Sequence, residues 1–351
     1  MNLASPQPVL DHVEEFESTS MRVPLRVAVV TPVFNDWASF ALLLRRMNEA
    51  FEESDVQLSI IAIDDGSMET WDWEGVAGIA GGPIVSIEVI RLGLNLGHQR
   101  AIAVGLVEVA VRNEFETVLV MDCDGEDRPV DAASLVRERS KNSESVLLAH
   151  RAERSEGETF KIWYYCYKLL FWLLTGRRIS FGNFSLLPHS ATRRLARMPE
   201  LWNNLPAAIM RSRLPYRMLP TSRGQRYAGK SKMALVSLVT HGLSAMSVYT
   251  DVIFVRVLIA AGAVAASTIL GMAITIFIRI ATQLAIPGWT TTAVGVLVIV
   301  LLQAVILVAA ALFLLLANRS ARPIIPLTDC EIFIESRTRR DFDMGSAVAA
   351  P

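Results

Sequence analysis

Short apolar runs alternate with segments of helical spacing through the first part of the chain. The runs have the length and bounding turn residues of buried strands, and apolar positions three and four residues apart mark helices. The predicted strands lie within 26–36, 58–67, 84–92, 117–121 and 145–149, and the predicted helices cover 38–53, 99–113 and 130–140. This alternation favours an α/β fold of Rossmann-like type, with a mostly parallel sheet and helices on both faces.

Polar loops follow four of the predicted strands. Sheets of this kind bind ligands beyond the carboxyl ends of their strands, where such loops gather. The loops are Pro32 to Asp36, Asp64 to Ser67, Asn95 to Gln99 and Asp122 to Asp127. We therefore expect a binding site at this edge of the sheet.

Two aspartates with one residue between them end the predicted strand 117–121. Strand alternation puts Asp122 and Asp124 on one side and points Cys123 away. Paired carboxylates suit Mg²⁺ or Mn²⁺, which prefer oxygen ligands and leave room for phosphate oxygens. The alternative is coincidence, because about one Asp-x-Asp is expected by chance in a chain of this length.

Two long apolar stretches, 257–278 and 290–317, carry no charged residue. The first would be roughly 33 Å long as a helix, which is enough to cross a membrane. A Pro287-Gly288 turn joins the two, so both ends of this hairpin lie on the same side, and Trp289 is expected at an interface. Arg279 alone lies on the turn side, whereas several cations flank the other ends. The positive charge predicts that the globular part and both termini are cytoplasmic, at a cell (inner) membrane.

The segment 160–174 is nearly apolar, rich in aromatic residues, interrupted by lysines and too short to span a bilayer. These features predict a helix lying in the membrane interface, and the alternative is a buried core helix. The predicted organisation is a flexible lead-in (1–22), a globular domain (23–229) with this helix, a second interfacial helix (230–250), two transmembrane helices (251–318) and a cytoplasmic tail (319–351).

Composition agrees with a globular part plus membrane spans, since 52% of the residues are hydrophobic and mean hydropathy is +0.37. A net charge of -1 argues against a nucleic-acid partner. The three cysteines, Cys123, Cys166 and Cys330, show no disulfide or zinc spacing, which favours a reducing compartment.

Five motifs follow one another along the chain. They are Pro32-Val-Phe-Asn-Asp36, Ile63-Asp-Asp-Gly-Ser67, Asn95-Leu-Gly-His-Gln99, Asp122-Cys-Asp124 and Arg226-Tyr-Ala-Gly-Lys-Ser-Lys232. In order and spacing they resemble the family-2 glycosyltransferases of GT-A fold, in particular the polyprenyl-phosphate (dolichol-phosphate mannose synthase-like) branch. The resemblance covers about 26–249, and a C-terminal pair of spans is also usual in that branch.

This resemblance implies an inverting transfer of one sugar from a UDP- or GDP-sugar to undecaprenyl, dolichyl or another polyprenyl phosphate at the cytoplasmic membrane face. It implies a Mg²⁺ or Mn²⁺ ion on Asp122 and Asp124, with help from Glu126, where relatives often carry Gln. It implies a nucleoside pocket of Pro32, Phe34, Asp36, Ile63 and Asp65. It further implies phosphate contacts from Arg151, Arg226 and Lys232, a substrate contact at Cys123, and catalytic positions at Asp124 and Asn183.

Two of these assignments have alternatives in the sequence. Arg226 and Lys232 could be ordinary interfacial cations beside lipid headgroups. Asn183 stands in Gly182-Asn-Phe184, where the family often has an acid proposed as a base. An amide cannot take a proton, but a phosphomonoester with a second pKa of about 6 reaches the site largely ionised at pH 7. We therefore expect Asn183 to position substrate.

Two other functions are compatible with such a fold. A processive polysaccharide synthase would usually show a Gln-x-x-Arg-Trp motif and more spans, neither of which this sequence has. A non-catalytic membrane scaffold or flippase partner would have no need of the Asp-x-Asp. Small residues in the first span would also allow helices to approach closely, so a homo-oligomer formed through the hairpin is possible. They are Gly262, Ala265, Ala266 and Gly271.

Overall fold

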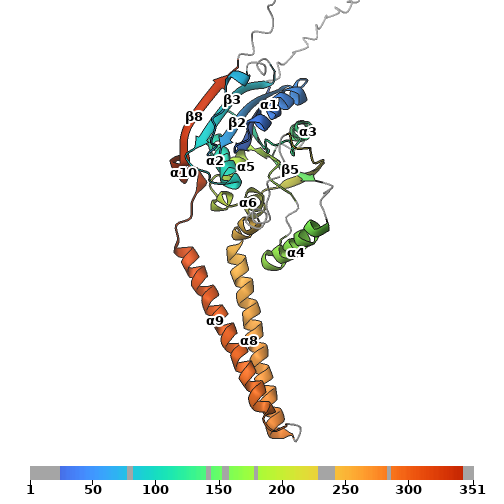
Figure 1. Ribbon diagram of the computed structural model, residues 1–351, viewed down its shortest axis with the longest axis vertical. Helices are drawn as coiled ribbons and strands as arrows, with labels where there is room; N and C mark the ends of the chain where they lie inside the picture. The colour runs from blue at the N-terminus through green and yellow to red at the C-terminus, as the bar shows by residue number, and fades with distance from the viewer. Residues whose placement is uncertain are drawn as a thin grey trace, which may run out of the picture.

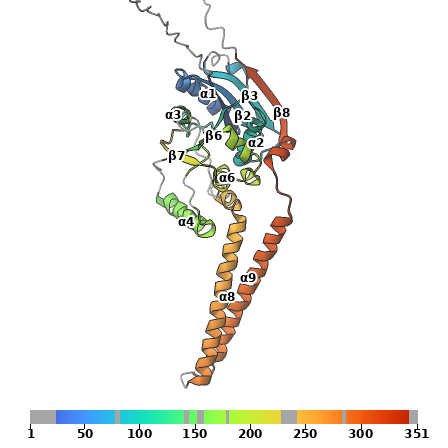
Figure 2. The ribbon, with the colours of Figure 1, turned by 180° about the vertical axis from the view of Figure 1, so that it is seen from behind.

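The computed structural model of the chain describes residues 24–76, 82–139, 144–151, 158–177, 181–227, 242–282 and 286–342. A globular part built on one sheet stands at one end of two long antiparallel helices (Figures 1 and 2). Its strands are β1 (Leu25–Val33), β2 (Val56–Asp64), β3 (Ile84–Leu92), β4 (Thr117–Val120), β5 (Val146–Arg151), β6 (Ser185–Pro188), β7 (Tyr216–Thr221) and β8 (Ile334–Asp341).

The helices of the globular part lie between these strands in the sequence. They are α1 (Trp37–Phe51), α2 (His98–Val111), α3 (Pro129–Arg139), α4 (Glu158–Thr175), α5 (His189–Leu195), α6 (Leu205–Ser212) and α10 (Pro326–Asp329). Short 3₁₀ turns cover Glu74–Val76, Pro199–Trp202 and Glu331–Phe333. The two long helices are α8 (Thr250–Ala281) and α9 (Trp289–Ser320).

The sheet has eight strands in the order β7-β5-β6-β4-β1-β2-β3-β8. Its centre, β4-β1-β2-β3, is parallel throughout, and β6 and β8 are the antiparallel members. The mostly parallel sheet predicted from the alternation of strands and helices is therefore confirmed. Parallel strands here run in one direction, so the loops that follow β1, β2, β3 and β4 meet at one edge.

Both faces of the sheet are buried, which explains why the central strands are mostly apolar on both sides rather than alternately apolar and polar. Val27 and Val29 of β1 face the cluster under α1 and α3, and Ala28 and Val30 face the cluster under α2, α5 and α6. Strand alternation divides each strand between two cores, and each core needs its own layer of helices. The prediction of helices on both faces is confirmed.

Helices α8 and α9 are 32 residues each, with mean hydropathies of 2.2 and 3.1, so by length and composition they could cross a membrane. Each contains one of the two predicted spans. They pack against each other toward the turn that joins them and separate toward the globular part (Figures 1 and 2). Gly271 faces Leu297 of α9 within the same chain, whereas a side chain at Gly262 would meet open space. Association of copies through the hairpin stays a prediction.

Helix α4 is not a buried core helix. One side, at Phe171, packs on Ala207 and Tyr249, while Tyr165 is 68% and Leu173 53% exposed. Arg256 of α8 donates to the carbonyl of Leu173 (2.7 Å) and so ties the end of α4 to the hairpin. An apolar helix face beside an apolar hairpin fits the predicted interfacial position. The second predicted interfacial helix lies mostly outside the described residues.

Strand β8 was not predicted, because its sequence Ile-Glu-Ser-Arg-Thr-Arg-Arg-Asp carries no strand pattern. It pairs antiparallel with β3 and covers what would otherwise be an open sheet edge. Arg337 of β8 reaches the buried Glu108 of α2 (2.9 Å), and Arg112 joins Glu108 to Glu88. This pairing requires the end of α9 to lie on the same side as the sheet, in agreement with the predicted hairpin.

Helix α2 lies so close to the sheet that only glycine fits at position 105. A Cβ there would overlap the side chain of Val30 and stand 3.1 Å from Ile63. Gly→Ala inside a helix normally stabilises by about 0.5–1 kcal/mol, but overpacking a core costs about 1–3 kcal/mol. We therefore predict that Gly105→Ala lowers the melting temperature of the detergent-purified protein. Gly295→Ala in α9, where a Cβ meets open space, is the matched control and should leave the melting temperature unchanged or raise it slightly; equal melting temperatures for both variants would contradict the close packing.

Candidate functional site

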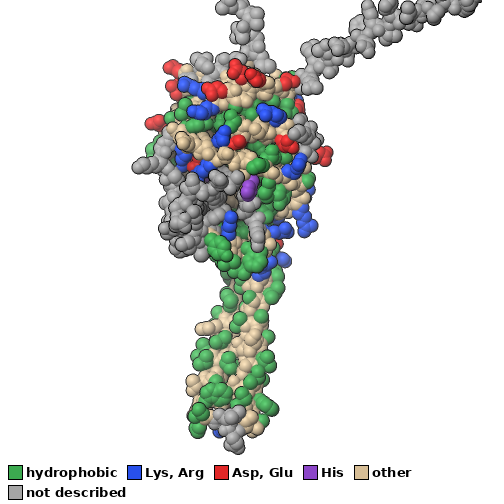
Figure 3. Space-filling view, turned by 90° about the vertical axis from the view of Figure 1, so that its right-hand side faces the viewer, with side chains coloured by type: hydrophobic (Ala, Val, Ile, Leu, Met, Phe, Trp, Pro, Cys, Tyr) green, Lys and Arg blue, Asp and Glu red, His purple; other side chains and the backbone are tan. Residues whose placement is uncertain are grey.

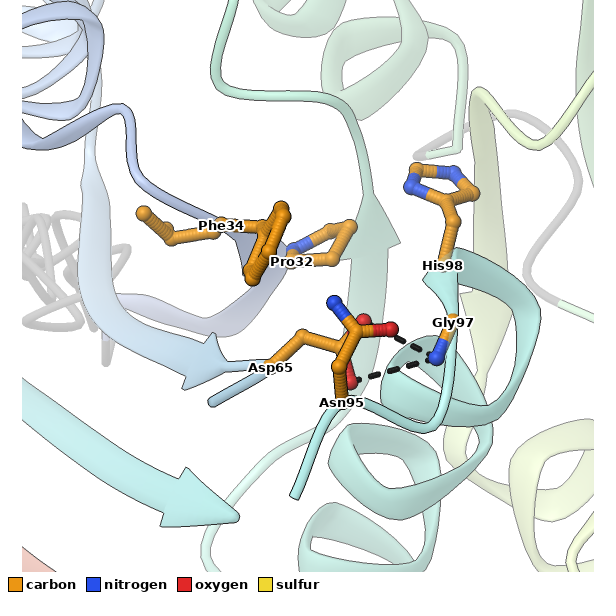
Figure 4. Close-up of a pocket in the computed structure, with 7 residues that line it drawn as sticks. Pro32, Phe34, Asp65, Asn95, Gly97 and His98 are labelled. Atoms are coloured by element: carbon orange, nitrogen blue, oxygen red, sulfur yellow. Dashed lines mark hydrogen bonds between the residues drawn. The ribbon is translucent and has the colours of Figure 1, made fainter. Parts of the chain in front are cut away.

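A cavity of about 250 Å³ opens at the edge where the parallel strands end. It is lined by Pro32, Val33, Phe34, Asp65, Asn95, Gly97 and His98 (Figure 4). These residues come from the loops after β1, β2 and β3 and from the first residue of α2. The predicted gathering of polar loops at one edge is thus what the structure shows.

Asp65 holds the walls of this cavity together. Its carboxylate accepts the backbone N–H groups of Leu96 (2.7 Å) and Gly97 (3.0 Å), as Figure 4 shows for Gly97. Gly97 has a φ of +91°, a conformation that favours glycine. Burial raises the pKa of Asp65, and the two N–H groups oppose that rise. Asp64 instead closes its own turn, by accepting from the N–H of Ser67 (2.8 Å).

The two aspartates after β4 face the same region and repel each other. Burial raises the pKa of Asp124, and the negative charge of Asp122 raises it further. Cys123 between them is 6% exposed and packs in the core, so it points away as predicted and could meet substrate only through its backbone. Two oxygen-rich side chains whose charges repel fit a divalent cation such as Mg²⁺ or Mn²⁺.

Arginines from the loop after β7 meet this acidic loop. Arg226 lies 2.8 Å from Asp124, and Arg223 lies 2.8 Å from Glu126. Backbone bonds from Tyr227 to Asp124 (2.8 Å) and from Gly224 to Glu126 (2.9 Å) hold the two loops together. Within the described ranges, no three His, Cys, Asp or Glu side chains gather into a metal-holding group.

His98 links the cavity to the aspartates. Its Nε2 lies 3.3 Å from Asp122 Oδ1 and 3.0 Å from Asn183 Nδ2. Burial tends to lower the pKa of His98, but the charge of Asp122 and the contact with it outweigh burial and raise that pKa. His98 therefore stands between the acidic pair and Asn183.

A chain of amides fixes which way Asn183 points. The backbone N–H of Leu205, at the start of α6, donates to Gln99 Oε1 (2.9 Å), and Gln99 Nε2 donates to Asn183 Oδ1 (3.0 Å). A backbone N–H can only donate, so Gln99 must turn its oxygen to Leu205 and its NH₂ to Asn183. Asn183 consequently presents its own NH₂ toward His98 and the site. It can donate hydrogen bonds there, as an anionic substrate requires.

A second cavity of about 80 Å³ lies next to Asp64, on the other side of the loop that holds Asp65. It is lined by Asp64, Thr70, Trp71, Trp73, Val89, Arg91, Ser336 and Thr338. Arg91 Nη1 and Trp71 Nε1 are buried, and neither has a hydrogen-bond partner in the part of the chain that the structure describes. A buried donor without a partner costs about 1–3 kcal/mol. Water, or a ligand that carries acceptors, would satisfy both of them in this small cavity.

The predicted site residues fall into three groups. Pro32, Phe34 and Asp65 line the larger cavity, and Asp122, Asp124, Arg226 and Asn183 lie around it. Asp36 stands before α1 and Ile63 is buried in the core, so neither lines the cavity. Arg151 ends β5, with its side chain outside the described part of the chain, and Lys232 lies outside it altogether.

Several residues of the site were not predicted. Asn95, Gly97, His98 and Gln99 stand in one of the five motifs, and this motif was the signal that could have identified them. Asp64 stands in another of these motifs, whereas Trp71 and Arg91 carry no such signal, because only the folded sheet brings Arg91 to Asp64 (3.7 Å).

Comparisons with known proteins agree with the motifs. The family described as "Glycosyl transferase family 2" matches residues 28–206. An undecaprenyl-phosphate 4-deoxy-4-formamido-L-arabinose transferase of Erwinia tasmaniensis is 25% identical over 61% of this chain and 65% of its own length. The dodecaprenyl-phosphate galacturonate synthase of Rhizobium johnstonii is 25% identical over 53% of this chain and 54% of its length. An uncharacterized glycosyltransferase of Bacillus subtilis, YkcC, is 21% identical over 76% of this chain and 81% of its own.

The matches span 65% of the length of the Erwinia transferase and 54% of that of the Rhizobium synthase, less than two thirds of each. Among solved structures, glucosyl-3-phosphoglycerate synthase of Mycobacterium tuberculosis superimposes with a TM-score of 0.47 at 12% identity, covering 65% of this chain and 80% of that one. The family match itself extends over more than half of the chain and includes the motifs from Pro32 to Asn183. The chain belongs to glycosyl transferase family 2.

Proposed function

We propose that the protein transfers one sugar from a uridine diphosphate sugar to a polyprenyl phosphate at the membrane surface. The observation that carries this proposal is the meeting of the acidic pair, Asp122 and Asp124, with Arg226 and Asn183 beside one cavity. Such a site suits two phosphorylated substrates. The relatives named for undecaprenyl- and dodecaprenyl-phosphate support a polyprenyl phosphate as the acceptor.

The smaller cavity supports uridine as the nucleoside. Arg91 Nη1 and Trp71 Nε1 are donors, and the Asp64 carboxylate is an acceptor. The edge of uracil presents a carbonyl on each side of one N–H and so matches two donors and one acceptor. Guanine presents one carbonyl and two N–H groups, which would leave one buried donor without a partner.

Asp122 and Asp124 would hold Mg²⁺ or Mn²⁺, which offsets the charge of the diphosphate as UDP leaves. In the protein alone, Arg226 supplies the positive charge at Asp124 (2.8 Å). If a metal ion neutralised the Asp124 carboxylate, Arg226 would be available to contact a phosphate oxygen. Its planar guanidinium, with several N–H donors, is suited to that contact. Arg223 would hold Glu126 in the same loop.

The acceptor site would lie between Asn183 and the apolar face of α4. The exposed rings and leucines of α4 continue onto the start of α8, which Arg256 ties to Leu173. Figure 3 shows hydrophobic side chains covering the hairpin, with Lys and Arg side chains gathered where it meets the globular part. A lipid chain would follow the apolar surface, and its phosphate would reach the N–H donors of Asn183.

The transfer would be a single displacement. A phosphate oxygen of the acceptor attacks the anomeric carbon while the bond to UDP breaks, and UDP leaves with the electron pair, so the anomeric configuration inverts. No proton has to be removed, because the phosphomonoester is largely ionised at pH 7. This accounts for an amide, Asn183, where a sugar hydroxyl acceptor would need a base. The cations at the globular end of the hairpin support a cytoplasmic location for this site.

Transfer of radiolabel from UDP-sugars into organic-extractable lipid, with and without Mn²⁺, tests the function. We expect an ion-dependent lipid product carrying one sugar from at least one UDP-sugar, and none from GDP-sugars. Asp124→Asn should lower its formation by about 100-fold or more, since it removes a metal carboxylate. Asp55→Asn, at an exposed position on the opposite edge of the sheet, is the control and should retain full activity. A water-soluble polymer would indicate a processive synthase, and no transfer at all would favour a non-catalytic scaffold.

Asn183→Ala should lower turnover by about 10-fold without abolishing it, because the residue orients an already ionised phosphate. The same variant should bind Mn²⁺ and UDP as the unaltered protein does. Initial rates at varied acceptor concentration, together with calorimetric titration of UDP, measure both quantities. Loss of all activity with ion affinity intact would contradict the positioning role and require Asn183 to act in the chemistry.

A further inference from the structure

The small cavity beside Asp64 has a wall made by the strand that follows the membrane hairpin. Ser336 and Thr338 of β8 stand opposite Arg91 and Val89 of β3, and all four line the cavity. Residues two apart on a strand point to the same face, which explains why Ser336 and Thr338 both reach it. The chain therefore leaves the sheet, runs through α8 and α9, and returns to complete this cavity (Figure 1).

An irregularity in β8 brings Glu335 to Arg91. The pairing register shifts between Arg91, opposite Ser336, and Leu92, opposite Ile334, so that Glu335 is the extra residue of a bulge. Bulges redirect a side chain that regular alternation would turn to the other face. Here the Glu335 carboxylate accepts from Arg91 Nε at 3.0 Å.

The guanidinium of Arg91 is held at two of its three nitrogens. Glu335 holds Nε, and the carbonyl of Ser67 accepts from Nη2 (3.1 Å). Because the group is planar, two anchored nitrogens fix the direction of the third. Nη1 is left buried at the cavity, 3.7 Å from Asp64.

We propose that β8 is part of the donor site, with Glu335 as the positioning residue that aims Arg91 Nη1 at the nucleobase. The inference rests on the proposed function, since it takes the ligand of this cavity to be the uracil of a uridine nucleotide. If Glu335 has this role, the affinity for the nucleotide-sugar donor depends on β8. This strand follows the membrane hairpin and lies outside the segment 28–206 that matches the family.

The attachment of β8 does not itself depend on Glu335. Arg337 donates to both oxygens of Glu108, at 3.3 and 2.9 Å, and β8 pairs with β3 along its length. Removing the Glu335 carboxylate should therefore leave the strand in place. Glu331 offers a matched control, because it also pairs with an arginine of this segment, Arg337, without contacting Arg91.

The test is calorimetric titration of UDP, CDP and GDP, with Mn²⁺, into the detergent-purified full chain and its variants. Glu335→Ala should raise the Kd for UDP by about three- to fivefold, which is the effect of losing an ion pair at a partly exposed site. The ratio of the Kd for CDP to the Kd for UDP should become smaller. Turnover at saturating donor and the KM for acceptor should change less than twofold. Glu331→Gln should leave all of these values unchanged.

A double-mutant cycle separates positioning from a structural role. If Glu335 acts through Arg91, then Glu335→Ala should have no further effect on UDP binding in an Arg91→Ala background.

Equal Kd values for Glu335→Ala and the unaltered chain, or additive effects in the cycle, would overturn the inference even if UDP-sugar transfer is observed. Glu335-dependent UDP binding without transfer to any polyprenyl phosphate would instead uphold the inference and refute the acceptor of the proposed function. A chain that binds no uridine nucleotide would overturn the inference together with the choice of donor.

Discussion

Repulsion between the carboxylates of Asp122 and Asp124 is the constraint around which the site is built. Both follow one short strand, and burial together with the charge of Asp122 raises the pKa of Asp124. The protein surrounds them with positive or donating groups from distant segments, among them Arg226 and His98. A divalent cation and a diphosphate together would satisfy both the acids and the arginines, which explains why such different charges are gathered at one edge.

The position of these acids was predictable from the sequence, because it depends on local pattern. Apolar runs of strand length gave the parallel centre of the sheet, and the direction of parallel strands puts the loops after Val33, Asp64, Leu92 and Val120 together. The predicted alternation gave the right side for Cys123, which is buried although it lies in the turn after β4. Glu126 was harder, because its pairing with Arg223 depends on a loop about a hundred residues away.

What the sequence did not predict is held by long-range contacts. Strand β8 is mostly polar. It is stabilised by backbone pairing with β3 and by the ion pair of its Arg337 with Glu108. Gln99 gained its role only when folding put Leu205 on one side of it and Asn183 on the other. In the sequence, Arg91 has no feature that distinguishes it from other strand residues. In the folded protein it contacts Asp64 of β2 and Glu335 of β8. Such positions need the tertiary fold, since no local periodicity marks them.

The hairpin and the sheet form one unit. Arg256 fastens α8 to α4 at one end, and β8 fastens the far end of α9 to β3. The globular part is therefore attached to the apolar helices at two places.

The most direct measurement of the central claim is the paramagnetic resonance spectrum of Mn²⁺ titrated with the purified protein, in the presence and absence of UDP. The account predicts that the protein binds one Mn²⁺ per chain, that UDP tightens this binding, and that Asp122→Asn weakens it. The account would be contradicted if the protein left the spectrum of free Mn²⁺ unchanged and if, in the presence of UDP, the protein caused no change beyond that caused by UDP alone.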